Sequence, residues 1–177
     1  MAANGVPAWF AATSGMKPAS LIFLYWLETW IIAFYTAKKI MKAKSPMTEA
    51  EKNWMRIQFL APRGVEPTRE SIHEVFIKQA VLIIIVYGAI LFGFVVPEAL
   101  EQGGSYWSRV WTTVPQSGAT LLWLLTSASG LAISHGISYY SNFLAKGEYL
   151  STSPARQSLM LGDRLIAMHV FLVLGSV

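Results

Sequence analysis

Long apolar stretches separated by short polar segments dominate the chain. Residues 19–37, 75–96 and 117–140 are each long and apolar enough to cross a bilayer, because a hydrocarbon core about 30 Å thick needs roughly 20 residues of α-helix. A fourth apolar stretch covers residues 165–177, and we expect it to be a truncated span. The pattern predicts an all-α fold: a polytopic transmembrane helix bundle with at least four membrane helices, in a single domain over residues 1–177.

A shorter amphipathic segment lies between the first two stretches. Thr48 and Glu51 have the spacing of a capping box, which marks the first turn of a helix. Apolar residues before and after this start recur on one helical face: Met47, Ala50, Trp54 and Ile57. The segment therefore predicts one interfacial helix lying on the membrane surface, with a partner protein as the alternative cover for its apolar face.

Proline and glycine predict where other helices begin and end. Pro97 is expected to end the second apolar stretch, because proline removes a helical hydrogen bond. Gly147 suits the left-handed position that closes a helix, and Ser153-Pro154 suits the first residues of a new short helix.

Lysine and arginine predict the orientation of the spans. Basic residues are concentrated in the first-to-second and third-to-fourth connections: Lys38, Lys39, Lys42, Lys44, Lys52, Arg56, Arg63, Arg69, Lys78, Lys146, Arg156 and Arg164. The amino-terminal segment and the second-to-third connection, on the opposite side, hold only Lys17 and Arg109. By the positive-inside rule the amino terminus should lie outside and both basic loops in the cytoplasm.

Composition agrees with a membrane protein and excludes several other classes. Of the 177 residues, 54% are hydrophobic and 14% charged, whereas soluble domains carry about 25% charged residues. Cysteine is absent, which excludes disulfides and cysteine-ligated zinc or iron–sulfur centres. The net charge of +4 resides beside apolar spans instead of in a soluble basic patch, so no nucleic-acid partner is expected.

Glu28 is an ionisable residue near the middle of the first predicted span. A charged carboxylate there costs several kcal/mol unless it is paired, hydrated or protonated. Glu28 is therefore either a proton carrier or metal ligand, or a hydrogen-bonded carboxyl that fixes helix packing near Trp26 or Trp30.

Small residues repeat along the third predicted span. Gly130, Ser134 and Ser138 recur every fourth position, and Ala132 with Gly136 forms a second such pair. Small residues at this spacing let two helix backbones approach closely in lipid. We expect Gly130, Ser134 and Ser138 to form a helix-packing surface, either within the chain or with helices of another chain.

Two histidines are candidates for cofactor or metal binding. His135 precedes the end of the third span by five residues, and His169 follows Arg164 by five residues at the start of the fourth. Adjacent antiparallel helices would bring the two imidazoles together, with Glu28 slightly deeper. Such a set could hold haem axially, or a metal ion through His135, His169 and Glu28. Hydrogen-bonded structural histidines are the alternative, and His73 is expected to be a solvated helix-end residue.

Two sequence strings resemble a known but uncharacterised family. Residues 21–28 read LIFLYWLE, residues 134–153 read SHGISYYSNFLAKGEYLSTS, and His169 follows Arg164 at a five-residue spacing. They are similar to a family of bacterial multi-pass membrane proteins known only as a domain of unknown function. The resemblance implies a bacterial inner-membrane location and assigns no activity. The matching residues are Glu28, His135, Glu148, Tyr149, Arg164 and His169.

Three functions are compatible with these features. The preferred hypothesis is a non-catalytic subunit packed among other membrane subunits, because the chain is small and has a small-residue surface. The alternatives are a haem- or metal-binding redox protein using His135 and His169, and a proton-coupled transporter using Glu28. A hydrolase is not expected, since the neighbours Ser134 and His135 point about 100° apart on a helix.

Overall fold

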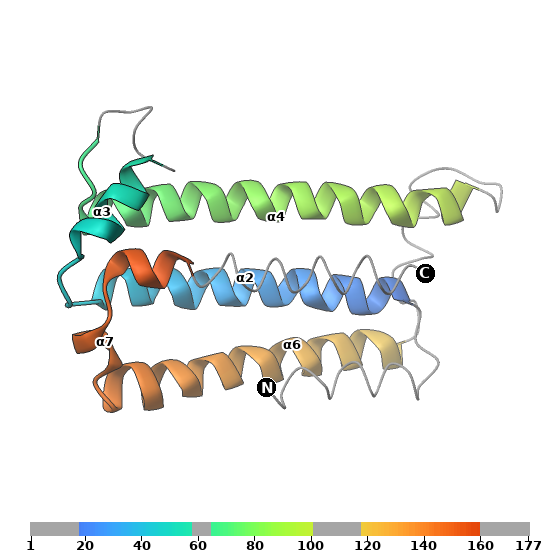
Figure 1. The fold of residues 1–177 in the computed structure, drawn as a ribbon. Helices are drawn as coiled ribbons and strands as arrows, with labels where there is room; N and C mark the ends of the chain where they lie inside the picture. The colour runs from blue at the N-terminus through green and yellow to red at the C-terminus, as the bar shows by residue number, and fades with distance from the viewer. Residues whose placement is uncertain (1–17, 58–64, 101–117, 160–177) are drawn as a thin grey trace. The chain divides into compact units, whose positions relative to one another are not determined.

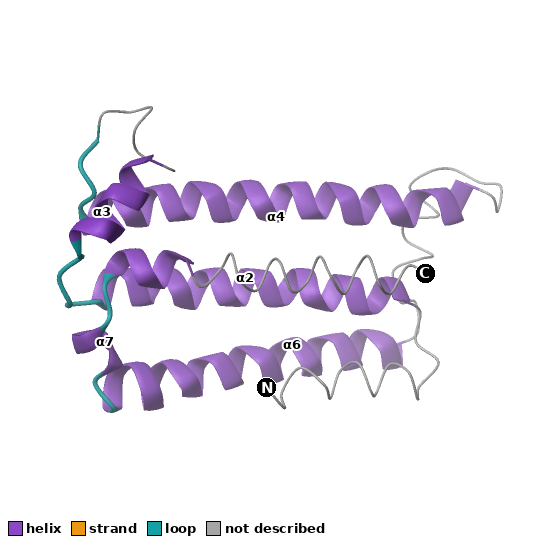
Figure 2. Cartoon of the chain, viewed as in Figure 1, coloured by secondary structure: helices purple, strands orange, loops and turns teal. Residues whose placement is uncertain are grey.

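The computed structural model describes residues 18–57, 65–100 and 118–159, and within them every regular element is helical (Figures 1 and 2). The helices are α2 (Pro18–Lys42), α3 (Glu49–Met55), α4 (Arg69–Leu100), α6 (Gly118–Ser138), the π-helix η4 (Tyr139–Ala145) and α7 (Glu148–Ser151). Residues 154–159 add a short unlabelled helix. The predicted all-α class is confirmed for this part of the chain.

The predicted spans fall on the long helices. Residues 19–37 lie in α2, residues 75–96 in α4, and residues 118–138 of the third predicted span in α6. Among the described residues, one helical stretch, Arg69–Ala89, is long and apolar enough to cross a membrane. The predicted span over residues 165–177 lies outside the described residues, so a bundle of at least four membrane helices stays a prediction.

Helix α4 does not end where its proline predicts. It continues through Pro97 to Leu100, which corrects the expectation that Pro97 ends the helix. The physical reason is that proline disturbs the turn before it, while its own fixed φ of about −65° is compatible with helix. The turn that follows can therefore remain helical.

The chain divides into two compact units, one containing residues 1–29 and 84–132, the other residues 30–83 and 133–177. In the first unit, α2 contacts α4 through Trp26, whose indole Nε1 donates a hydrogen bond to the Ile84 carbonyl oxygen at 3.0 Å. Gly88 lies against the same ring, because a Cβ there would be 3.5 Å from Nε1. A methyl group at position 88 would be in ordinary van der Waals contact with the indole.

In the second unit, the segment after α2 is tied to α7 by backbone hydrogen bonds. The Lys44 amide donates to the Tyr149 carbonyl at 2.7 Å, and the Ser45 amide donates to the Thr152 carbonyl at 3.2 Å. Gly147 permits the turn that leads into α7, because its φ of 75° is left-handed. This confirms the left-handed conformation predicted for Gly147.

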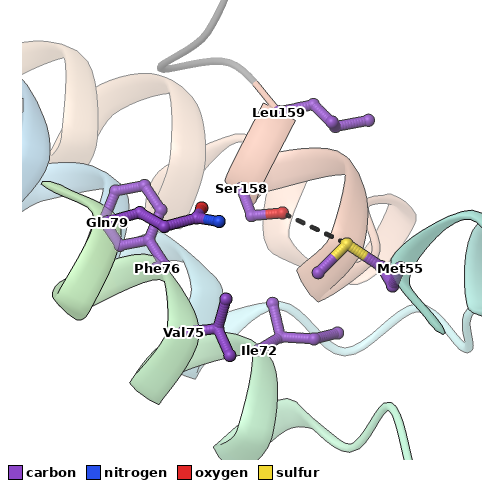
Figure 3. A pocket seen from close by; sticks show the side chains of 7 residues that line it. All are labelled: Met55, Ile72, Val75, Phe76, Gln79, Ser158 and Leu159. Carbon is purple, nitrogen blue, oxygen red and sulfur yellow. Dashed lines mark hydrogen bonds between the residues drawn. The ribbon is translucent and has the colours of Figure 1, made fainter. Parts of the chain in front are cut away.

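The capping box predicted for α3 is also confirmed. The Glu51 amide donates to Thr48 Oγ1 at 3.2 Å, and the Thr48 amide donates to Glu51 Oε2 at 2.8 Å. Trp54 and Ile57, on the predicted apolar face, are exposed. Met55 is buried instead and lines a small cavity with Ile72 of α4 (Figure 3).

Candidate functional site

A row of aromatic rings connects α2, α6, η4 and α7 within the second unit. Tyr35 of α2 stacks on His135 of α6 with ring centroids 6.5 Å apart, and lies 5.7 Å from Tyr139. Tyr139 stacks on Phe143 at 5.7 Å, and Phe143 lies 6.2 Å from Tyr149. These separations are within the favourable range for aromatic pairs, about 4.5–7 Å. His135 is therefore held as the first ring of a packed row.

Lysines of α2 and the following segment lie over these rings. The Lys39 ammonium is 5.2 Å from the centre of the Phe143 ring, and the Lys44 ammonium is 5.3 Å from that of Tyr149. A cation within about 6 Å of an aromatic ring centre is attracted by the negative face of the ring. The two lysines therefore strengthen the contact that α2 and the segment after it make with η4 and α7.

Beside this row, α2, α4 and η4 line an open groove of about 570 Å³. One face of α2 forms its wall, with residues at helical spacing: Phe34, Ala37, Lys38, Met41 and Lys42. His73 of α4 lines the groove as well, together with Tyr139, Tyr140 and Leu144. The groove therefore combines two lysines and a histidine with apolar surface. Its volume is within the range of small-molecule binding sites, about 300–1,000 Å³.

The lysines of the groove have no carboxylate partner within the part of the chain that is described. Lys38 lies over the Phe34 ring, with its ammonium 4.4 Å from the ring centre. Neither Lys38 nor Lys42 forms an ion pair with any carboxylate whose side chain the structure describes. Glu74, which follows His73, pairs with Lys78. The groove therefore carries an excess of positive charge.

A second, partly open cavity of about 20 Å³ lies between α3, α4 and residues 154–159 (Figure 3). Met55, Val75 and Phe76 supply apolar walls, while Gln79 and Ser158 supply polar groups. Ser158 Oγ has two acceptors in reach of its one proton, the Ala155 carbonyl oxygen at 2.7 Å and the Met55 sulfur at 3.8 Å. This space is sufficient for one water molecule, which needs about 10–15 Å³, and too small for a substrate.

Glu51 links α3 to the carboxyl-terminal part of the described chain. Besides capping α3, its carboxylate accepts a hydrogen bond from the Ser153 hydroxyl at 2.9 Å. Ser153 Oγ in turn accepts from the Arg156 amide at 3.2 Å, which confirms Ser153-Pro154 as the start of a short helix. Neighbouring Glu49 has a lowered pKa because Lys52 donates to it and attracts its charge, but this exposed pair adds little stability.

The candidate metal and cofactor residues are placed only in part. Glu28 is buried, with 6% of its surface exposed, and His135 is half-buried against Tyr35. His169 and Arg164 lie outside the described residues. No group of three histidine, aspartate or glutamate side chains within the described ranges is arranged to hold a metal ion. Haem or metal binding through Glu28, His135 and His169 therefore stays a prediction, as does proton transport through Glu28.

Some of the small residues of α6 face open space, and others are in contact with neighbouring side chains. A Cβ added at Gly130 would meet nothing within 4 Å, and Ser134 is exposed. Ser138 is half-buried and accepts a hydrogen bond from Asn142 at 3.4 Å. The close approach instead occurs at Gly136, where a Cβ would be 2.7 Å from the Tyr35 hydroxyl oxygen. Packing of the predicted Gly130, Ser134 and Ser138 surface against another chain stays a prediction.

Sequence reasoning did not identify the groove. The sequence pattern places Lys38 and Lys42 among the basic residues that orient the spans, and predicts a solvated helix end for His73. One sequence pattern could have indicated the groove. Phe34, Lys38 and Lys42 are four residues apart, which puts an aromatic and two basic residues on one face of α2. Glu148 and Tyr149 of the resemblance lie in α7, where Tyr149 ends the aromatic row.

Comparison with known proteins identifies a family without a known activity. The chain belongs to a family of unknown function (DUF6498), whose family model matches residues 1–177. No curated protein matches the chain. No solved structure matches it either.

Proposed function

We propose that this member of the family is an integral membrane protein that acts as a non-catalytic subunit of a larger membrane complex. In this proposal α2, α4 and α6 cross the bilayer of the bacterial inner membrane, a further span follows Arg164, and α3 lies at the cytoplasmic surface. The amino terminus is outside and both basic loops are cytoplasmic.

The apolar surface of α4 supports the membrane location. Arg69–Ala89 is apolar enough to cross a membrane, yet only 28% of its most apolar window is buried inside the chain. Val81, Leu82, Ile85 and Val86 are all exposed, by 42–62%. A core helix of a water-soluble protein would be buried on such a surface. Hydrocarbon is a solvent in which this exposure costs nothing.

The open face of α6 carries the subunit proposal. Gly130 and Ser134 are uncovered, and the neighbouring Ile133 and Ile137 are 62% and 61% exposed. Lipid tails cover large apolar side chains as well as small ones, so lipid alone does not call for a glycine and a serine one turn apart. A closely packed second helix does, because small residues let the two backbones approach.

Photo-crosslinking at this face tests the proposal. A photoreactive amino acid replaces Ile133, and the tagged protein is irradiated in native membranes and purified in a mild detergent. We expect a discrete, stoichiometric protein adduct from position 133. A protein that purifies alone, without an adduct, would contradict the proposal.

Two variants show whether the contact depends on the small residues. The same photoreactive residue at Ile85 of α4, which is 62% exposed, is the matched control and should yield lipid adducts only. Gly130→Leu should abolish the adduct at position 133, because the added side chain separates the helix backbones. An adduct that survives Gly130→Leu would mean that the partner does not pack on the small residues.

A further inference from the structure

We propose that the groove lined by Phe34, Lys38, Lys42, His73 and Tyr140 binds the phosphate headgroup of an anionic phospholipid. This inference rests on the proposed membrane location. It adds a ligand class and a binding site to the proposed subunit, and it does not depend on which partner α6 contacts.

The groove has a polar and an apolar end along α2. Phe34, Lys38 and Lys42 follow one another at one-turn spacing on the same helical face, so they cover roughly 12 Å of the helix axis. Phe34 belongs to the predicted span, while Lys38 and Lys42 follow its end at residue 37. An acyl chain would lie against Phe34 and a headgroup against the lysines.

The charges of the groove suit a phosphate. Lys38 and Lys42 provide two ammonium groups that no carboxylate of the described residues neutralises. His73 adds an imidazole on the α4 side of the groove, and the adjacent carboxylate of Glu74 pairs with Lys78. Basic pockets between membrane helices at the cytoplasmic side are typical binding sites for anionic lipid headgroups.

The apolar walls favour a lipid over a soluble phosphate. Phe34 is 55%, Met41 42% and Tyr140 64% exposed, so the lysines are bordered by uncovered aromatic and aliphatic surface. A soluble phosphate would leave this surface in contact with water. A phospholipid covers it with an acyl chain while its phosphate meets the ammonium groups, as expected for amphipathic ligands at a membrane interface.

Lipid binding is measured by mass spectrometry on the intact protein released from nanodiscs. The nanodiscs contain phosphatidylcholine with a minor fraction of phosphatidylglycerol. We expect the wild-type protein to retain phosphatidylglycerol selectively. Lys38→Gln/Lys42→Gln should bind phosphatidylglycerol roughly 30-fold more weakly, since each lysine near an anionic headgroup contributes about fivefold.

The control double variant, Lys52→Gln/Lys146→Gln, removes the same charge outside the groove. It should retain phosphatidylglycerol as the wild type does. Equal losses in the two double variants would overturn the proposal, because the effect would then reflect net charge. No selective retention by the wild type would overturn it as well.

Two further measurements distinguish a lipid site from other outcomes. Glycerol phosphate added in solution should not displace the bound lipid; complete displacement would assign the groove to a soluble phosphate and overturn the lipid proposal. Extraction of native membranes with alkaline carbonate tests the membrane location separately. A protein that resists extraction but shows no lipid selectivity refutes the groove proposal alone, whereas an extracted protein refutes the proposed function.

Discussion

Gly136 shows how a single hydrogen atom in place of a side chain can set a helix contact. A Cβ at this position would lie 2.7 Å from the Tyr35 hydroxyl oxygen and 3.5 Å from its Cζ. The ring that would have to move also packs against His135 and Tyr139. At Gly130, by contrast, an added Cβ meets nothing within 4 Å.

Gly136→Ala should therefore lower the free energy of unfolding by about 1 kcal/mol, because displacing Tyr35 outweighs the gain in helix propensity of roughly 0.5–1 kcal/mol. In a Tyr35→Phe background, where the hydroxyl oxygen is gone, the same substitution should be neutral or stabilising. Denaturant-induced unfolding in detergent micelles, followed by circular dichroism, measures both.

Gly130→Ala is the matched control for this prediction. In the isolated chain it should not destabilise, since there is open space for the methyl group. Equal effects of Gly136→Ala with and without the Tyr35 hydroxyl would contradict the proposed crowding.

At the scale of elements, one carboxylate joins two helix starts that lie far apart in the chain. Glu51 caps α3 through its contact with the Thr48 amide, and accepts from Ser153, 102 residues further on. Ser153 caps the helix at residues 154–159 through the Arg156 amide. The hydrogen bond between Glu51 and Ser153 therefore connects the two caps. Removing either side chain should destabilise both short helices.

A double-mutant cycle of Glu51→Ala and Ser153→Ala should reveal this connection. Each single variant should lose about 1–2 kcal/mol of unfolding free energy, the usual cost of losing a cap. The pair should show a coupling of about 0.5–1.5 kcal/mol, the value of one hydrogen bond. Hydrogen exchange of the amides in α3 and in residues 154–159 would locate the losses.

Glu49→Ala combined with Ser153→Ala is the control cycle. Glu49 is in the first turn of α3 as well, but pairs with Lys52 at the surface, so its effect should add to that of Ser153→Ala without coupling. Additivity in the Glu51 cycle would mean that the 2.9 Å contact contributes nothing to stability.

At the scale of the whole molecule, the proposed topology places α3 and the connection that contains Arg109 on opposite sides of the membrane. The natural chain has no cysteine, so each single-cysteine variant reports one position without background. Asn53 of α3 is exposed and suits a label on the cytoplasmic side. Arg109 lies outside the described residues and serves as the other position.

In right-side-out spheroplasts, a membrane-impermeant maleimide should label Arg109→Cys and leave Asn53→Cys unmodified until the membrane is permeabilised. The distribution of lysine and arginine supports this result, because basic loops remain in the cytoplasm. Labelling of both positions before permeabilisation would contradict the topology.

The sequence by itself determined the features that depend on neighbouring residues. The capping box at Thr48 and Glu51, the left-handed Gly147 and the helix start at Ser153-Pro154 each involve contacts within a few positions, which residue type and spacing encode. The long helices α2, α4 and α6 follow from continuous apolar stretches. The prediction that Pro97 ends its helix was wrong, because a proline constrains the turn before it more than the turn after it.

The tertiary structure decided which distant residues meet. The periodicity of one helix does not state which partner its face contacts, so the bond from Trp26 to Ile84, 58 residues away, had no signal in the pattern. The same holds for the choice of Gly136 over Gly130 as the close approach, and for a groove that α2 shares with His73 and Tyr140. Helix faces are local properties, whereas contacts between them depend on how the elements pack.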